Sequence, residues 1–220
     1  MRVTRNSLIL SVLLVSLALM GSAFASSVTM TYEGHQGVVA KDGSPYVGYP
    51  YYVSINGSTT FTPLMCDSFD NNIYKGETWT ATVSPFLQGI SGSLFGSGMT
   101  LDYKAAGLIF KGMLAGTISN TSGQWAIWGL FSSNAQAQSQ FTITGAASIE
   151  ATYLALAQTD PNSAYNGLLL YTPVAGTQSW GGMPQEFIGY SAVPEPSSLM
   201  LMGTGLIGFA GALRRKFAKA

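Results

Sequence analysis

The chain has 220 residues, of which 47% are hydrophobic and 9% are charged, and its ten basic and ten acidic residues give a formal net charge of zero. The charges are unevenly placed, because residues 26–193 contain four basic and nine acidic residues and carry a formal charge of −5. An acidic surface of this kind excludes nucleic acid and anionic lipid as favoured partners.

The N-terminal segment has the three parts of a secretory signal peptide. Arg2 and Arg5 give a basic start, an apolar stretch follows at 8–20, and Ala23 and Ala25 form the small-x-small pattern that precedes a cleavage site. The apolar stretch is shorter than the roughly 20 residues that a membrane span needs. We therefore expect signal peptidase to remove residues 1–25, cutting before Ser26, and the remainder to be exported.

The C-terminal segment combines a proline motif, an apolar stretch and a basic end. Residues 197–213 contain no charge and have the shortest length that can span a bilayer. Basic residues directly after such a span hold that end in the cytoplasm. The motif consists of Val193, Pro194, Glu195 and Pro196, and the basic end begins with Arg214, Arg215 and Lys216.

In this order over residues 194–220, the three parts resemble a PEP-CTERM sorting signal. The resemblance implies a membrane transpeptidase, exosortase, that cuts near the motif and discards the tail. It also implies a Gram-negative bacterium, an inner-membrane intermediate held by the span, and a final place on the cell surface or in an exopolysaccharide matrix. A permanent single-pass anchor is the alternative.

Residues 26–193 have the length of a single domain and predict an α+β fold. The first half is rich in Thr, Val, Tyr and Phe, which is typical of a β-sandwich or barrel, and Asn56-Gly57 indicates a hairpin turn. Strands are predicted at 26–34, 46–57, 58–69 and 77–84, and short late strands at 167–172 and 185–190.

A helical insertion of about three helices is expected between the early and the late strands. A flexible glycine-serine loop at 89–98 precedes it. The helices are predicted at 101–116 from an Asp102 cap, at 121–131 from a Thr121 or Ser122 cap, and at 145–161.

Cys66 is the only cysteine of the chain. Most cysteines of exported proteins pair, so a lone one needs an explanation. It can be a buried apolar filler, half of an intermolecular disulfide, a nucleophile, or bonded to an atom other than sulfur. A nucleophile needs a base, and the only histidine, His35, lies in a polar stretch that is typical of a turn.

Gln124 is the second unusual residue. On the predicted helix it shares one face with Ile127 and Trp128, so its amide points inward from the first turn. A buried amide without partners costs about 1–3 kcal/mol. Both anomalies disappear if the Cys66 thiol attacks the Gln124 amide, releases ammonia and leaves an internal thioester.

The amide groups at the start of the helix are expected to steady the developing oxyanion of this reaction. Aromatic side chains are expected to keep water away from the bond. The residues predicted to surround it are Asp67, Trp79, Trp125 and Trp128.

A second resemblance supports this pair. Bacterial thioester-domain adhesins carry a Tyr-Cys-x-Asp-like stretch on a strand and, later, a Gln-x-Ala-Ile-Trp-like stretch that opens a helix. Residues 124–128 read Gln-Trp-Ala-Ile-Trp and are similar to the second stretch, whereas Met65 stands where the first stretch has an aromatic. The resemblance loosely covers residues 46–160 and implies covalent attachment to amines on a host or matrix surface.

We therefore expect an adhesion or binding protein rather than an enzyme, without a metal site or a cofactor. The alternative is a non-covalent carbohydrate-binding or structural matrix protein with an inert buried cysteine. Aromatic strand residues such as Tyr51, Tyr52 and Trp79 suit sugar stacking, although such residues are more often core. The oxygen-rich stretch at 67–72 leaves calcium binding open.

Overall fold

The computed structural model describes residues 25–38, 46–191 and 204. Nearly all of the predicted signal peptide, with Ala23, and the whole sorting motif and basic end lie outside these residues. Residues 1–189 cluster as one compact unit and residues 190–220 as a second, of which only Tyr190, Ser191 and Thr204 are described. A single domain over 26–193 stays a prediction.

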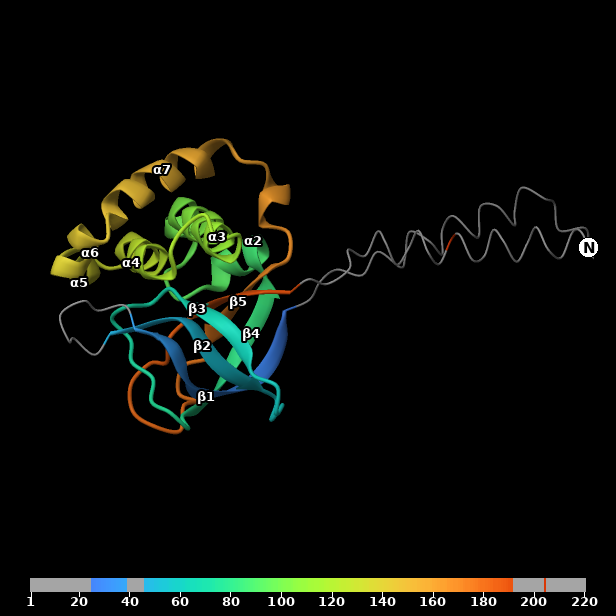
Figure 1. Ribbon diagram of the computed structural model, residues 1–220. Helices are drawn as coiled ribbons and strands as arrows, with labels where there is room; N and C mark the ends of the chain where they lie inside the picture. The colour runs from blue at the N-terminus through green and yellow to red at the C-terminus, as the bar shows by residue number, and fades with distance from the viewer. Residues whose placement is uncertain (1–24, 39–45, 192–203, 205–220) are drawn as a thin grey trace, which may run out of the picture. The chain divides into compact units, whose positions relative to one another are not determined.

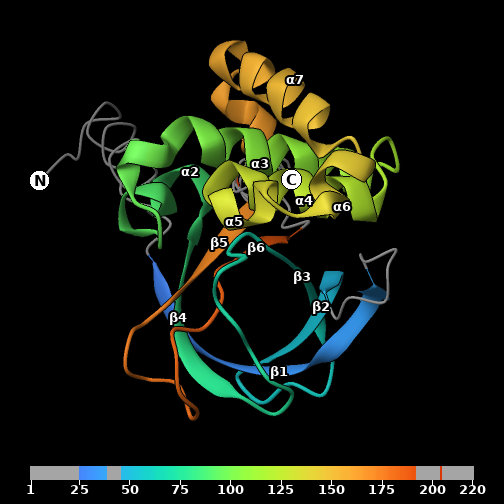
Figure 2. The ribbon, with the colours of Figure 1, turned by 90° about the vertical axis from the view of Figure 1, so that its left-hand side faces the viewer.

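Six strands close into a barrel in the order β1-β2-β3-β6-β5-β4 (Figure 2). Because β1 also pairs with β4, every described strand has a partner on both sides, and the barrel has no exposed sheet edge. The predicted α+β class, the early strands and the short late strands are confirmed, and of the two predicted arrangements the barrel is the one that forms. The strands are β1 (Ser26–Val38), β2 (Val47–Ile55), β3 (Thr62–Cys66), β4 (Thr78–Pro85), β5 (Leu168–Pro173) and β6 (Phe187–Tyr190).

Alternation of side chains fills the inside of the barrel. Met30 and Tyr32 on β1 are buried, as are Tyr51 and Val53 on β2, because side chains two positions apart share a face of the sheet. The chain leaves β2 through Asn56 and a following glycine, which have φ values of 52° and 73°. These left-handed values are those of a type I′ turn, so the predicted Asn-Gly turn is confirmed.

The helices lie together on one side of the barrel (Figure 1). The three predicted helices correspond to α3 (Thr100–Leu114), α4 (Asn120–Phe131) and α7 (Ala146–Thr159). The described residues hold more helices than the three predicted, because four- and five-residue helices are too short to show a hydrophobic period. The additional helices are α2 (Phe86–Gly89), α5 (Ser133–Gln136) and α6 (Ser139–Ile143).

Three local predictions in this region were wrong. Met99 occupies the cap position of α3, and Asp102 lies in its first turn. The cap of α4 is Ser119, whose hydroxyl accepts a 3.1 Å hydrogen bond from the Ser122 amide. The expected flexible loop at 89–98 contains two short 3-10 helices, at Ile90–Gly92 and Ser97–Met99.

Helix α4 is central to the packing. Every residue from Gly123 to Leu130 is buried, because α4 packs against α3 and α7 on one side and against β1, β2 and β3 on the other. A helix that is apolar all round is typical of such a position. It carries Gln124 into the contact between the helices and the barrel.

Candidate functional site

The candidate site joins the end of β3 to the second turn of α4. Cys66 is the last residue of β3 and pairs with Phe187 on β6. Gln124 is the fifth residue of α4. Both side chains are fully buried, so the structure brings together the two residues that the sequence singled out, 58 positions apart.

Gln124 is held by two hydrogen bonds that fix its amide. Its Nε2 donates to the Cys66 carbonyl oxygen at 2.7 Å, and its Oε1 accepts from the Tyr49 backbone amide of β2 at 3.0 Å. The prediction that amides of the first helical turn would hold the carbonyl was wrong, because α4 begins earlier than expected. A backbone amide of the barrel takes that role.

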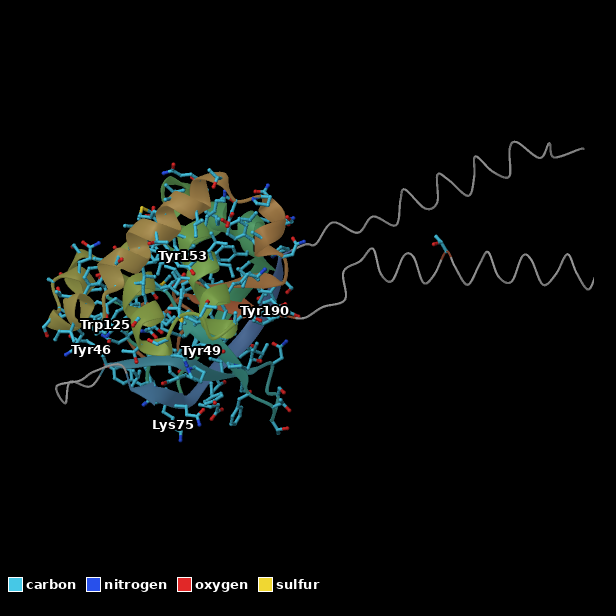
Figure 3. The ribbon with its side chains drawn as sticks, turned by 45° about the horizontal axis from the view of Figure 1, so that its top comes forward. Tyr46, Tyr49, Lys75, Trp125, Tyr153 and Tyr190 are labelled. Atoms are coloured by element: carbon cyan, nitrogen blue, oxygen red, sulfur yellow. The ribbon has the colours of Figure 1, made fainter. Side chains whose placement is uncertain are left out.

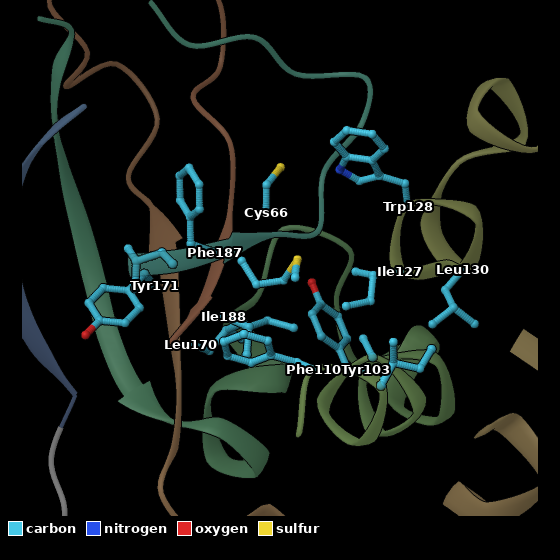
Figure 4. Packing of buried hydrophobic residues seen from close by; sticks show 14 of the residues in the cluster. Cys66, Tyr103, Phe110, Ile127, Trp128, Leu130, Leu170, Tyr171, Phe187 and Ile188 are labelled. Atoms are coloured by element: carbon cyan, nitrogen blue, oxygen red, sulfur yellow. The ribbon is translucent and has the colours of Figure 1, made fainter. Parts of the chain in front are cut away.

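The Cys66 thiol is enclosed. Its sulfur lies 3.6 Å from the Ser68 carbonyl oxygen, to which it donates. Burial, and then the negative charge of Asp67, raises the pKa of the Cys66 thiol to about 12. The Trp128 indole faces the sulfur (Figure 4) and, like the groups of Ser68, acts in the opposite direction on this pKa without overcoming burial.

Aromatic rings from three segments pack beside this pair. The rings of Trp125 and Trp128 meet at 5.1 Å with planes at 84°, and Phe69 lies 5.2 Å from the ring of Trp128. Tyr46 packs on Trp125 at 5.4 Å (Figure 3). Its hydroxyl donates to Gln138 at 3.3 Å. The sequence analysis did not predict the half-buried rings of Phe69 and Tyr46 at the site. Only the position of Phe69, three residues after Cys66, could have indicated that it lies beside the thiol.

Trp79, also expected beside the bond, lies elsewhere. It is fully buried inside the barrel, where its ring stacks on that of Phe187 at 6.2 Å and 23°. Phe187 pairs with Cys66 across strands β6 and β3, so Trp79 contacts the strand partner of Cys66.

Asp67 belongs to a buried acidic cluster. Glu186, which the sequence analysis missed, accepts hydrogen bonds from the hydroxyls of Tyr103 and Thr172, the latter at 2.6 Å, and from the Leu94 amide at 2.9 Å. Neither carboxyl oxygen of Asp67 has a hydrogen-bond partner of ordinary geometry in the described part of the chain. Burial and the neighbouring Glu186 carboxylate hold the pKa of Asp67 well above its usual value.

Two other interpretations of Cys66 lose support from this geometry. A thiol with no exposed surface cannot pair with a second chain without opening the fold. His35, the candidate base, has its Nδ1 3.0 Å from the Tyr32 hydroxyl on the same strand. Over residues 25–38 and 46–191, no three His, Cys, Asp or Glu side chains gather in a way that could hold a metal ion.

The match to a known protein family lies in the C-terminal tail of the chain. Residues 192–216 match the family model of the PEP-CTERM protein-sorting motif. The chain carries a PEP-CTERM sorting signal. A PEP-CTERM protein is exported, processed by exosortase and placed at the cell surface.

No curated protein and no solved structure matches the chain. None of these comparisons supports the resemblance of residues 46–160 to thioester-domain adhesins. Among the described residues, no helix combines the length and the hydropathy that crossing a membrane requires. The span predicted at 197–213 lies outside those residues apart from Thr204.

Proposed function

We propose that this PEP-CTERM protein is an adhesion protein that attaches covalently to its target through an internal thioester between Cys66 and Gln124. The observation that supports the proposal most directly is the 2.7 Å hydrogen bond from Gln124 Nε2 to the Cys66 carbonyl oxygen. This bond holds a side-chain amide against the only cysteine of the chain, inside a core with no exposed surface at either residue.

The proposed bond forms without an external reagent. The Cys66 sulfur attacks Cδ of Gln124, the bond from Cδ to Nε2 breaks, and the thiol proton leaves with the nitrogen as ammonia. As the sulfur attacks, negative charge develops on Oε1. The Tyr49 amide already donates to that oxygen at 3.0 Å, which is the arrangement of an oxyanion hole.

The surroundings favour an intramolecular reaction over reaction with solvent. With a pKa of about 12, the thiol stays neutral at ordinary pH and resists external electrophiles and oxidants. Its reaction with Gln124 therefore depends on proximity, which can replace a large part of a barrier when two groups are held together. Trp125 and Trp128 exclude the water that would hydrolyse the product.

In the second step a target amine attacks the thioester carbonyl. An amide forms between the target and Gln124, the bond from sulfur to carbon breaks, and the proton of the amine returns to Cys66 as a thiol. The target reaches the bond past the half-buried rings of Tyr46 and Phe69. Lysine side chains and amino sugars of a host or matrix surface are the proposed targets.

Methylamine tests this function because it is small enough to enter the site. After incubation with methylamine, the peptide containing Gln124 should carry an N-methylamide and Cys66 should become titratable. Cys66→Ala and Gln124→Glu should each abolish labelling. Gln185→Ala is the matched control, since Gln185 is another buried glutamine. Its Nε2 donates at 2.7 Å to the carbonyl oxygen of Asn71, in the connection that follows Cys66. Absence of label on Gln124 in the wild-type chain would leave the alternative of an inert buried cysteine.

The route to the surface is proposed from the ends of the chain. Signal peptidase cuts between Ala25 and Ser26, which leaves β1 whole because that strand begins at Ser26. The span at 197–213 and the basic end at 214–216 hold an inner-membrane intermediate of a Gram-negative cell. Exosortase then cuts near 193–196 and releases the domain to the cell surface or to the extracellular matrix.

A further inference from the structure

A cleft lies beside strands β1 and β2, and neither Cys66 nor Gln124 lines it. It has a volume of about 560 Å³ and is bounded by β1, β2 and the connection from β3 to β4. Figure 3 places Lys75, one of its residues, on the side of the barrel opposite the helices. Its lining combines aromatic rings with charged and polar groups, chiefly those of Glu33, His35, Tyr52, Phe61, Tyr74 and Lys75.

Exposed aromatic rings gather at this cleft. Phe61 is 46% exposed and Tyr74 is 56% exposed, and both line it. Trp180 is 48% exposed, and its ring lies 6.2 Å from that of Tyr74, so it extends the aromatic surface beyond the cleft. Single exposed apolar side chains are ordinary, whereas several in one place indicate an interaction site.

The turn that carries Tyr74 is braced by a buried carboxylate. Glu77 is fully buried, and its Oε2 accepts from the Tyr74 amide at 2.9 Å, while the Glu77 amide donates to the Tyr74 carbonyl oxygen at 2.8 Å. Gly76, with a φ of 87°, donates from its amide to the Tyr32 carbonyl oxygen of β1 at 2.8 Å. Tyr74 and Lys75 are therefore presented on a fixed backbone.

The segment that carries Trp180 is fixed as well. The Ser179 amide donates to the Thr78 carbonyl oxygen at 2.8 Å, and the Thr78 amide donates to the Ser179 hydroxyl at 2.9 Å. Two segments from distant parts of the chain thus place their rings side by side. Rings that are positioned before binding lose little conformational entropy when a ligand arrives.

Polar groups beside the rings supply donors and acceptors. The Tyr52 hydroxyl donates to Gln36 at 2.6 Å and keeps its oxygen as an acceptor, and the His35 ring is oriented by the Tyr32 hydroxyl. Lys75 and Glu33 add one charge of each sign. The lining thus favours a neutral ligand rich in hydroxyl groups.

We propose that this cleft binds a neutral oligosaccharide chain of β-linked glucose or N-acetylglucosamine units. Such sugars have equatorial substituents, so each ring presents an apolar C–H face to Tyr74 or Trp180 and a rim of hydroxyls to the polar groups. The open shape suits a segment of a polymer. The formal charge of −5 on residues 26–193 opposes nucleic acid and other polyanions. Neither Cys66 nor Gln124 lines the cleft, so the proposed binding does not depend on a thioester.

Trp180 provides a reporter for the test. The chain has four tryptophans, and the other three, Trp79, Trp125 and Trp128, are at most 2% exposed. Cellohexaose and N-acetylchitohexaose should each be titrated into the exported, processed chain carrying Cys66→Ala. We expect at least one of them to change the Trp180 fluorescence saturably, and calorimetry to give the same affinity.

Variants locate the binding. Tyr74→Ala should weaken it by about tenfold or more, the effect of losing one stacked ring, while Tyr74→Phe should largely keep it. Leu156→Ala on α7 removes another exposed apolar side chain, 42% exposed, and should change nothing. No binding of either sugar at millimolar concentration, an unchanged affinity in Tyr74→Ala, or a preference for polyanionic alginate would each overturn the proposal.

Discussion

Gln124 on α4 donates from Nε2 to the carbonyl oxygen of Cys66 on β3, and its Oε1 accepts from the amide of Tyr49 on β2. One buried side chain therefore ties the helical layer to two strands of the barrel. This polar contact consists of hydrogen bonds to backbone atoms, so it persists when the thiol is removed. Its structural contribution can be measured separately from the chemistry.

The first prediction measures that contribution. In a Cys66→Ala background, adding Gln124→Ala should lower the free energy of unfolding by about 1–3 kcal/mol, because a buried amide and a buried carbonyl lose their partner. Urea denaturation followed by circular dichroism measures the change. Gln136→Ala, on an exposed glutamine that bonds to the Gly129 carbonyl oxygen at 2.9 Å, should cost much less. Equal effects of the two substitutions would contradict a specific role for Gln124.

The second prediction concerns pH. Burial raises the pKa of Asp67 well above its usual value and that of Glu150 from 4.5 to about 7. The unfolded chain releases these protons at lower pH than the folded chain, so their contribution to stability is complete at acidic pH. It is lost as pH rises through the range from about 4.5 to about 7 for Glu150.

Asp67→Asn tests the Asp67 part, because asparagine has the shape of a protonated aspartate and does not ionise. Melting temperatures recorded from acidic to neutral pH should depend less on pH in Asp67→Asn than in the wild type. Asp160→Asn, outside the buried cluster, should retain the wild-type profile. A steeper profile in Asp67→Asn would show that the carboxylate is ionised and stabilising in the fold.

The third prediction concerns the contact between α4 and α7. A Cβ atom on Gly129 would stand 2.0 Å from Glu150 Oε1 and 2.3 Å from the ring of Phe141. Gly129→Ala should therefore destabilise the protein by about 1–3 kcal/mol through overpacking. A Cβ on Gly98 would meet no atom within 4 Å, so thermal unfolding of Gly98→Ala should match the wild type. A Gly129→Ala chain of undiminished stability would mean that the two helices pack less closely than described.

The fourth prediction concerns sorting. In a cell with exosortase, the surface form should end near 193–196 and lack the apolar segment at 197–213. C-terminal sequencing by mass spectrometry identifies the last residue. Replacing Pro194 and Pro196 by alanine should leave the chain unprocessed in the membrane fraction, because proline favours the extended backbone that protease grooves bind. Surface protein that retains Arg214 to Lys216 would indicate a permanent anchor.

The sequence predicted the strands and long helices well because their signals are local. The alternation on β1 and β2, the Asn56-Gly57 turn and the apolar α4 each depend on residues close in the chain. The caps were harder, because Ser119 and the predicted Ser122 are equally good capping residues by type. Short α5 and α6 have no periodicity to detect.

The candidate site was predictable only in part. Cys66 and Gln124 stood out as a lone thiol and an inward amide, but nothing local indicated that Tyr49 would donate to Gln124. Glu186 and Phe69 reach the site through barrel closure and loop packing, which link segments far apart in sequence. Trp79 was misplaced because strand alternation does not say how far along the barrel a buried ring lies.

The central claim is that Cys66 and Gln124 share a covalent bond, and mass measures it directly. The exported chain, purified without exposure to amines and with both ends determined by sequencing, should be lighter than its sequence mass by one ammonia. Cys66→Ala and Gln124→Glu should each show their full sequence mass, and the Gln185→Ala control should keep the deficit. A wild-type chain of full sequence mass, with one thiol that titrates on unfolding, would contradict the thioester.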